Sequence, residues 1–268
     1  MKKTKKIAIM CAVLLSIACF MTAFAASSSK TPPVKGGIPE GTKIYAAETT
    51  ETEVSAEQKK KAEKATSMDL VLILDKSGSM YGLEKDTIGG FNSMLDKQRE
   101  SNLPVKVTAV MFNNAVSTIY ERTDLNKVKN ITEKEYTPQG TTALLDAVGN
   151  TLSQLKTLPD IDAKGNKVLV VITTDGKENA SKEWTYAKVK ALISELQKKN
   201  FEFVFLGANI DAAAAAQNIG IKKENAVKYK NTKTGVKANF RAVNAMVDDY
   251  AAGEMKAARW KKEVEEDK

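Results

Sequence analysis

Short, uninterrupted apolar runs recur along the middle of the chain. Leu70–Leu74 is apolar throughout and ends at Asp75, and Val168–Ile172 is a second run of the same kind. Runs this short are typical of strands that are buried on both faces of a parallel sheet. The same reasoning predicts further strands over residues 105–112, 201–206 and 226–229.

A hairpin is predicted in the first half of the chain. Asn113-Asn114 lies between the strand at 105–112 and another strand candidate, Ala115–Tyr120. Asparagine favours tight turns because it tolerates positive φ angles. These two strands are therefore predicted to pair in the antiparallel sense.

Apolar residues spaced three and four apart lie between the strands and predict amphipathic helices. The helical faces are formed by Ile88, Phe91 and Leu95; by Leu144, Leu145, Val148, Leu152 and Leu155; by Val189, Leu192, Ile193 and Leu196; and by Val236, Phe240, Val243, Val247 and Tyr250. Alternating strands and helices predict an α/β fold with helices on both faces of the sheet. Gly89-Gly90, inside the first helix, predicts a close approach of that helix to the sheet.

The first 25 residues have the pattern of a secretory signal peptide. Lys2, Lys3, Lys5 and Lys6 precede an uncharged, mostly apolar stretch, and Ala23-Phe24-Ala25 offers small residues for cleavage. An uncleaved N-terminal membrane anchor and lipid attachment at Cys19 are the alternatives. The pattern predicts a protein that is secreted or held in the cell envelope.

The composition changes again at two later points. Residues 26–67 are rich in Ser, Thr, Pro, Gly, Lys and Glu and have few apolar side chains, which predicts a disordered polar spacer. Residues 68–253 hold the strand and helix patterns and form the predicted domain. Residues 254–268 are charged and predict a frayed helical tail.

Composition excludes several kinds of chemistry. The chain has no histidine, and its two cysteines, Cys11 and Cys19, both lie in the predicted signal peptide. Ser-His-Asp and Cys-His catalysis is therefore excluded, as are His-ligated metal sites. The 41 Lys and Arg, less the four lysines of residues 1–25, leave 37 against 33 Asp and Glu, a net charge of +4. So mild and mixed a charge does not favour nucleic acid as a partner.

Three polar clusters, residues 75–80, 139–144 and 173–176, follow predicted strands or begin a predicted helix. Singly, such residues most often cap helices or form turns. Together they are expected at one edge, because α/β sheets bind ligands beyond the carboxyl ends of their strands. Two carboxylates and three hydroxyls at that edge suit Mg²⁺, Mn²⁺ or Ca²⁺.

These clusters resemble a known motif. Asp75-x-Ser77-Gly78-Ser79, Gly140-x-Thr142 and Thr174-Asp175-Gly176 are similar, in order and position, to the metal-ion-dependent adhesion site of the von Willebrand factor A domain. Gly82-Leu83 and residues 87–92 and 206–212 resemble stand-alone bacterial members in particular. The resemblance covers residues 68–253. It implies a Rossmann-like, doubly wound, mostly parallel six-stranded sheet with one antiparallel edge strand. The metal ligands that it implies are Asp75, Ser77, Ser79, Thr142 and Asp175.

The resemblance also implies a function, namely an exported module that captures an Asp or Glu carboxylate of a protein partner through Mg²⁺, or through Mn²⁺ or Ca²⁺. Such capture would serve adhesion or envelope assembly. Candidates for the rim around the site are Met80, Tyr81, Gln139, Lys177, Glu178 and Asn209.

Two other functions are weighed against this one. One is an accessory subunit with an idle metal site. The other is a metal-dependent hydrolase, which is less favoured because no spare acid–base pair accompanies the ligands. We therefore expect no enzyme activity. Contact with a membrane is expected only through the N-terminal segment, and the partner and the oligomeric state stay open.

Overall fold

A computed structural model of the chain describes residues 63–254 and 257–265. The predicted signal peptide and nearly all of the predicted spacer lie outside these residues. Within them, six strands form one sheet in the order β3-β2-β1-β4-β5-β6. The strands are β1 (Ser67–Asp75), β2 (Val105–Phe112), β3 (Val116–Asp124), β4 (Asn166–Thr174), β5 (Phe201–Ala208) and β6 (Ala226–Tyr229). Only β2 and β3 pair antiparallel, as the Asn113-Asn114 turn predicts, and the other neighbouring strands are parallel.

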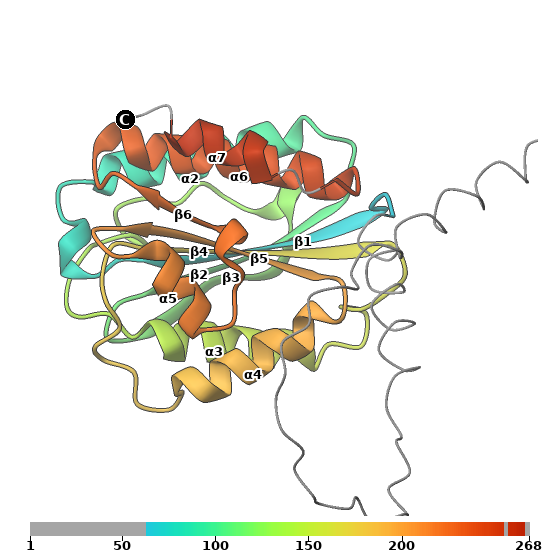
Figure 1. The fold of residues 1–268 in the computed structure, drawn as a ribbon. Coiled ribbons are helices and arrows are strands. Elements are labelled where there is room, and N and C mark those ends of the chain that lie inside the picture. Colours follow the sequence, from blue (N-terminus) through green and yellow to red (C-terminus); the bar gives the residue numbers. More distant parts are fainter. Residues whose placement is uncertain (1–62, 255–256, 266–268) are drawn as a thin grey trace, which may run out of the picture. The chain divides into compact units, whose positions relative to one another are not determined.

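Helices cover both faces of the sheet, which confirms the predicted doubly wound α/β fold (Figure 1). They are α2 (Glu84–Arg99), α3 (Leu144–Lys156), α4 (Tyr186–Gln197), α5 (Ala212–Asn218), α6 (Lys233–Ala251) and α7 (Ala257–Glu265). Helices α2, α6 and α7 lie on one face and α3, α4 and α5 on the other. Successive residues of a strand point to opposite faces, so β1 sends Leu70 and Leu72 into the first layer and Val71 and Ile73 into the second.

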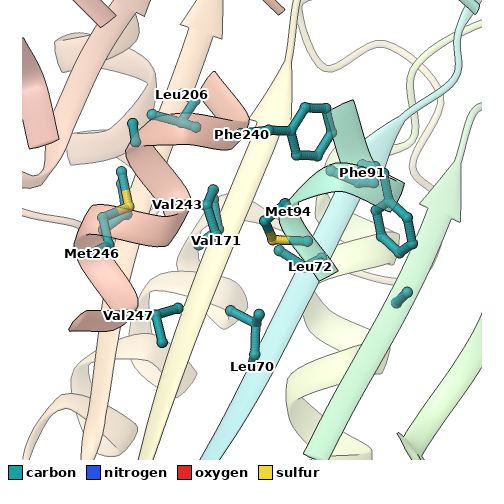
Figure 2. Close-up of a cluster of buried hydrophobic side chains, with 14 of the residues drawn as sticks. Leu70, Leu72, Phe91, Met94, Val171, Leu206, Phe240, Val243, Met246 and Val247 are labelled. Carbon is teal, nitrogen blue, oxygen red and sulfur yellow. The ribbon is translucent and has the colours of Figure 1, made fainter. Parts of the chain in front are cut away.

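The layer between the sheet and helices α2 and α6 is closely packed (Figure 2). Phe91 of α2 meets Phe240 of α6 edge to face, with ring centroids 6.4 Å apart. A Cβ on Gly90 would come within 2.3 Å of the Phe240 ring, whereas one on Gly89 would meet nothing within 4 Å. Gly90 therefore permits a close approach between helices α2 and α6. The prediction that this glycine serves the approach of the helix to the sheet was wrong.

An ion-pair network occupies the amino edge of the sheet, where the parallel strands begin. Asp69 of β1 is 1% exposed. Arg122 of β3 binds it with two hydrogen bonds, Nε to Oδ1 at 2.7 Å and Nη2 to Oδ2 at 3.0 Å. Arg122 also pairs with Asp160, which lies 3.3 Å from the Lys106 ammonium. Arg122 has a φ of 38°, a left-handed conformation that is uncommon outside glycine, at a bulge between β2 and β3.

The folded domain extends beyond both predicted boundaries. At its start, Ala65 and Thr66 donate backbone hydrogen bonds to Ala251 and Gly165, before β1 begins. At its end, α7 packs against α6, and its Trp260 side chain is 0% exposed. Residues 257–265 therefore belong to the fold, because one buried face of this charged helix suffices to dock it. In the described ranges, we find no helix with the length and apolar character that crossing a membrane requires.

Candidate metal centre

The predicted ligands meet at the carboxyl edge of the sheet, where β1 and β4 end. Ser77 and Ser79 lie on the turn after β1, and their hydroxyl oxygens are 3.1 Å apart. The Ser79 hydroxyl donates a 2.5 Å hydrogen bond to Oδ1 of Asp175, which directly follows β4. Two segments almost 100 residues apart in sequence are thereby joined through side chains whose polar atoms are all oxygens.

Asp75, the last residue of β1, is held firmly in place. Its Oδ1 accepts a 2.6 Å hydrogen bond from the Ser77 backbone N–H, and its Oδ2 accepts one of 2.6 Å from the Thr174 hydroxyl. The Tyr136 hydroxyl donates to the backbone carbonyl of Asp75 at 2.8 Å. With 2% of its surface exposed, the Asp75 carboxylate is fixed before any ligand arrives.

Thr142 reaches the same edge from the segment before α3. A Cβ on Gly176 would lie 2.8 Å from the Thr142 hydroxyl oxygen, so this hydroxyl lies against the residue that follows Asp175. Gly140, with a φ of +73°, turns the segment, and its carbonyl accepts a hydrogen bond from Gly78 N–H at 3.1 Å. All five predicted ligands therefore lie on adjoining segments at one edge.

The two carboxylates of this edge lack a cationic partner among residues 63–254 and 257–265. Burial is the main cause that raises the pKa of Asp75 and also that of Asp175, and the Asp175 charge adds to the effect on Asp75. Within the described residues, their side-chain oxygens accept hydrogen bonds from Ser, Thr, Asn and backbone donors, and no Lys or Arg pairs with them. The edge thus holds two buried acids that no Lys or Arg of the described part of the chain neutralises.

The donor set fits a hard divalent cation. No group of three or more His, Cys, Asp or Glu side chains in the described ranges is placed to hold a metal ion together, so this edge is not an acid-rich calcium cage. It instead combines two carboxylates, whose charge balances one divalent ion, with three neutral hydroxyls. The residues that would hold the ion are Asp75, Ser77, Ser79, Thr142 and Asp175.

Comparison with known proteins agrees with this geometry. Residues 69–242 match the family described as the von Willebrand factor type A domain. The chain belongs to this family. A search of curated proteins found no match.

Several solved structures resemble the A domain of this chain. The D319A mutant of the PilB minor pilin from Streptococcus sanguinis is 12% identical with a TM-score of 0.50, covering 70% of this chain and 63% of its own. A von Willebrand factor type A protein from Catenulispora acidiphila is 18% identical with a TM-score of 0.48, covering 68% and 43%. Proximal thread matrix protein 1 of the mussel byssus, with a zinc-occupied MIDAS motif, is 17% identical with a TM-score of 0.47, covering 70% and 46%. At these identities the likeness shows the fold alone, and this chain spans under two thirds of each structure.

Asn231 also lies at the carboxyl edge of the sheet. We call this edge, with Asp75, Ser77, Ser79, Thr142 and Asp175, the metal edge. Asn231 was not predicted there from the sequence. It lies between β6 and α6, and its Nδ2 donates to Oδ2 of Asp175 at 2.8 Å and to the Ser79 carbonyl at 3.3 Å. The rule that found the other clusters applies here as well, because Asn231 also follows the carboxyl end of a strand. Tyr136, in contrast, lies on an irregular segment and gives no local signal in the sequence.

The structure divides the predicted rim residues into two groups. Tyr81, Gln139, Lys177 and Asn209 are exposed, and Tyr81 is 81% exposed. Met80 is buried in the core, so it cannot line a rim. Glu178 turns inward, where its carboxylate accepts hydrogen bonds from Leu145 N–H and from the Ser181 hydroxyl and N–H. The rim assignments of Met80 and Glu178 were therefore wrong.

Proposed function

We propose that the chain is an exported module that binds a protein partner through a divalent cation, with Mg²⁺ as the principal ion and Mn²⁺ or Ca²⁺ as substitutes. One observation carries this proposal. Two buried carboxylates and three hydroxyls converge at one edge of the sheet, and no Lys or Arg of the described residues neutralises them. A fold that buries charge in this way gains from an external cation.

The exposure of the ligands supports a direction for partner binding. Asp75, Ser77, Thr142 and Asp175 are buried, whereas Ser79 is exposed. The bound ion would supply a positive centre that attracts an Asp or Glu carboxylate from outside. That carboxylate would approach over Ser79. Tyr81 and Lys177 are exposed and each lies two residues beyond a candidate ligand, so we propose that they contact the partner around that carboxylate.

Binding rather than catalysis is proposed because the acids of this edge are already committed. Both oxygens of Asp75 and both of Asp175 accept hydrogen bonds within the cluster. No histidine or cysteine of the domain is available as a general base or nucleophile. Export rests on the pattern of residues 1–25, and a role in adhesion or envelope assembly follows from export together with carboxylate capture.

Calorimetry on the full chain tests the metal site. We expect Mg²⁺ to bind the parent chain and not the Asp75→Ala variant. Asp96→Ala removes the same charge from an exposed position on α2 and should bind like the parent. Equal Mg²⁺ affinity in the parent and in Asp75→Ala would refute the site.

Partner capture tests the second half of the proposal. Envelope extract is passed over the immobilised chain in Mg²⁺ and then in EDTA. We expect a protein that is retained in Mg²⁺, is released by EDTA and is not retained by Asp75→Ala. Metal binding without any metal-dependent capture would favour the accessory subunit with an idle site instead.

A further inference from the structure

Three buried side-chain atoms behind the metal edge have no hydrogen-bond partner within the described part of the chain. They are Oη of Tyr229 on β6 and both Nδ2 and Oδ1 of Asn239 on α6. The hydroxyl of Thr87 on α2 lies in the same place and interacts with the Tyr136 hydroxyl. Thr87, Tyr229 and Asn239 are each at most 4% exposed, so bulk water does not reach them. Buried polar groups are nearly always hydrogen-bonded, and three exceptions in one place therefore require a cause.

The three side chains line a single cavity between the sheet and helices α2 and α6. The rest of its wall is largely apolar and includes residues drawn in Figure 2, namely Leu72, Val171, Leu206, Phe240 and Val243. The centre of a water molecule can occupy a volume of about 20 Å³ inside this cavity. One buried water needs roughly 10–15 Å³ by the same measure, together with two to four polar partners.

The polar groups of the cavity match a ligand that both donates and accepts hydrogen bonds. Burial raises the pKa of Tyr229 well above its ordinary value, so its phenol keeps its proton and can donate it. Asn239 contributes one donor and one acceptor, and the Thr87 hydroxyl can act as either. Asp75 also lines the cavity, but both of its carboxylate oxygens already accept hydrogen bonds from Ser77 and Thr174.

We propose that this cavity is a binding site for one ordered water molecule, which joins α2, β6 and α6 behind the metal edge. An apolar occupant would leave the Tyr229 hydroxyl and both Asn239 side-chain atoms unpaired, and the volume admits nothing much larger than water. This site does not depend on the metal.

The position of the water gives it a structural role. Tyr136 also lines the cavity, and its hydroxyl holds the backbone carbonyl of Asp75 at 2.8 Å. Burial raises the pKa of Tyr136 as well, so this phenol too stays a neutral donor. The water would therefore occupy the same cavity as the tyrosine whose hydroxyl holds the end of β1.

The sign of a stability change separates a hydrated cavity from a dry one. In a hydrated cavity, Tyr229→Phe loses a hydrogen bond, and we expect the Tm of the full chain to fall by about 2–4 °C. In a dry cavity the same change removes an unsatisfied hydroxyl, so the Tm would stay level or rise. Tyr81→Phe makes the identical change at a side chain that is 81% exposed and should leave the Tm unchanged.

A crystal structure of the parent chain supplies the second measurement. We expect a water peak within about 3.2 Å of Tyr229 Oη and of an Asn239 side-chain atom. A Tm for Tyr229→Phe equal to or above that of the parent overturns the proposal. So does a structure in which these side chains bond each other directly with no water between them, even if the Tm falls.

Discussion

Asp69 and Asp75 are buried carboxylates on the same strand, six residues apart, but they differ in the charge of the groups that donate hydrogen bonds to them. At the amino edge, Asp69 receives two hydrogen bonds from the Arg122 guanidinium and one of 2.8 Å from Asn166 Nδ2. At the carboxyl edge, Asp75 receives hydrogen bonds only from uncharged groups, and burial raises its pKa. One acid has a cation supplied by the fold, and the other does not.

The presence or absence of a cationic partner distinguishes an acid that stabilises the fold from an acid that is available to bind a cation. Burying a carboxylate is costly unless an opposite charge accompanies it. Where the chain supplies that charge, as at Asp69, the pair serves the fold. At Asp75 and Asp175 the described residues supply only hydrogen bonds, and the proposed divalent ion would supply the compensating charge.

The largest effect is expected from removing the cation of the amino edge. Arg122→Ala leaves the Asp69 carboxylate buried and unpaired, which should cost about 3–5 kcal/mol of unfolding free energy. Urea denaturation of the full chain measures it. Mg²⁺ affinity should not change, since Arg122 lies at the opposite edge. A loss below about 1 kcal/mol would contradict the structural role of this pair.

Removing an acid of the carboxyl edge should have the converse outcome. Asp75→Ala should weaken Mg²⁺ binding at least about 100-fold, which corresponds to about 2.7 kcal/mol of binding free energy. The urea midpoint without metal should move little, because the variant also relieves repulsion between Asp75 and Asp175. If Asp75→Ala unfolds as readily as Arg122→Ala, then Asp75 is a structural acid and the contrast fails.

Asn231 should have a smaller effect on the same binding reaction. It contacts Asp175 and the Ser79 carbonyl rather than an ion, and such supporting residues typically contribute about 10-fold or more to metal affinity. We expect Asn231→Ala to weaken Mg²⁺ binding about 10-fold in calorimetry, less than Asp75→Ala does. Gln139→Ala, an exposed change at the same edge, is the control. Unchanged affinity in Asn231→Ala would remove Asn231 from the site.

The smallest effect is a pH dependence of opposite sign at the two edges. The hydrogen bond from Arg122 lowers the pKa of Asp160 to about 2, so this acid stabilises the fold above about pH 4 and loses that effect as the pH falls toward 2. Asp160→Asn should therefore lower the urea midpoint at neutral pH and change it progressively less in acid.

The raised pKa values of Asp75 and Asp175 act in the other direction. Without metal, these acids favour the folded state less as the pH rises through their ordinary range, and Mg²⁺ should recover the loss. Equal pH profiles for the parent with and without Mg²⁺ would contradict this difference between the edges.

Local patterns sufficed for the fold, because apolar runs marked the strands. The carboxyl-end rule predicted that residues 75–80, 139–144 and 173–176 would meet at one edge although they are far apart in the sequence. The choice of five ligands among them came from the family resemblance. The pairing of Arg122 with Asp69 could not be predicted in this way. It depends on a bulge and on a left-handed backbone conformation of Arg122, and no sequence pattern indicates either of them.

The prediction of a frayed tail at residues 254–268 failed for a related reason. This segment is mostly charged, and the sequence indicates its buried face only through Trp260 and Val264, which lie four residues apart. Tyr136 was missed because its contact with Asp75 bridges 61 residues from an irregular segment. Contacts of this kind depend on the assembled core and carry no local signature.

The direction of β1 has a mechanical consequence. The chain enters the domain beside Ser67, and the metal edge begins eight residues later at Asp75, about 26 Å along the strand. A pull on the residues before Ser67 would therefore load the domain through its far end, and the proposed partner, held at Asp75, would pull from the opposite end. Force between the two would run lengthwise through β1, where the parallel strands β2 and β4 on either side resist it in shear. A module built in this way could hold the proposed partner under tension.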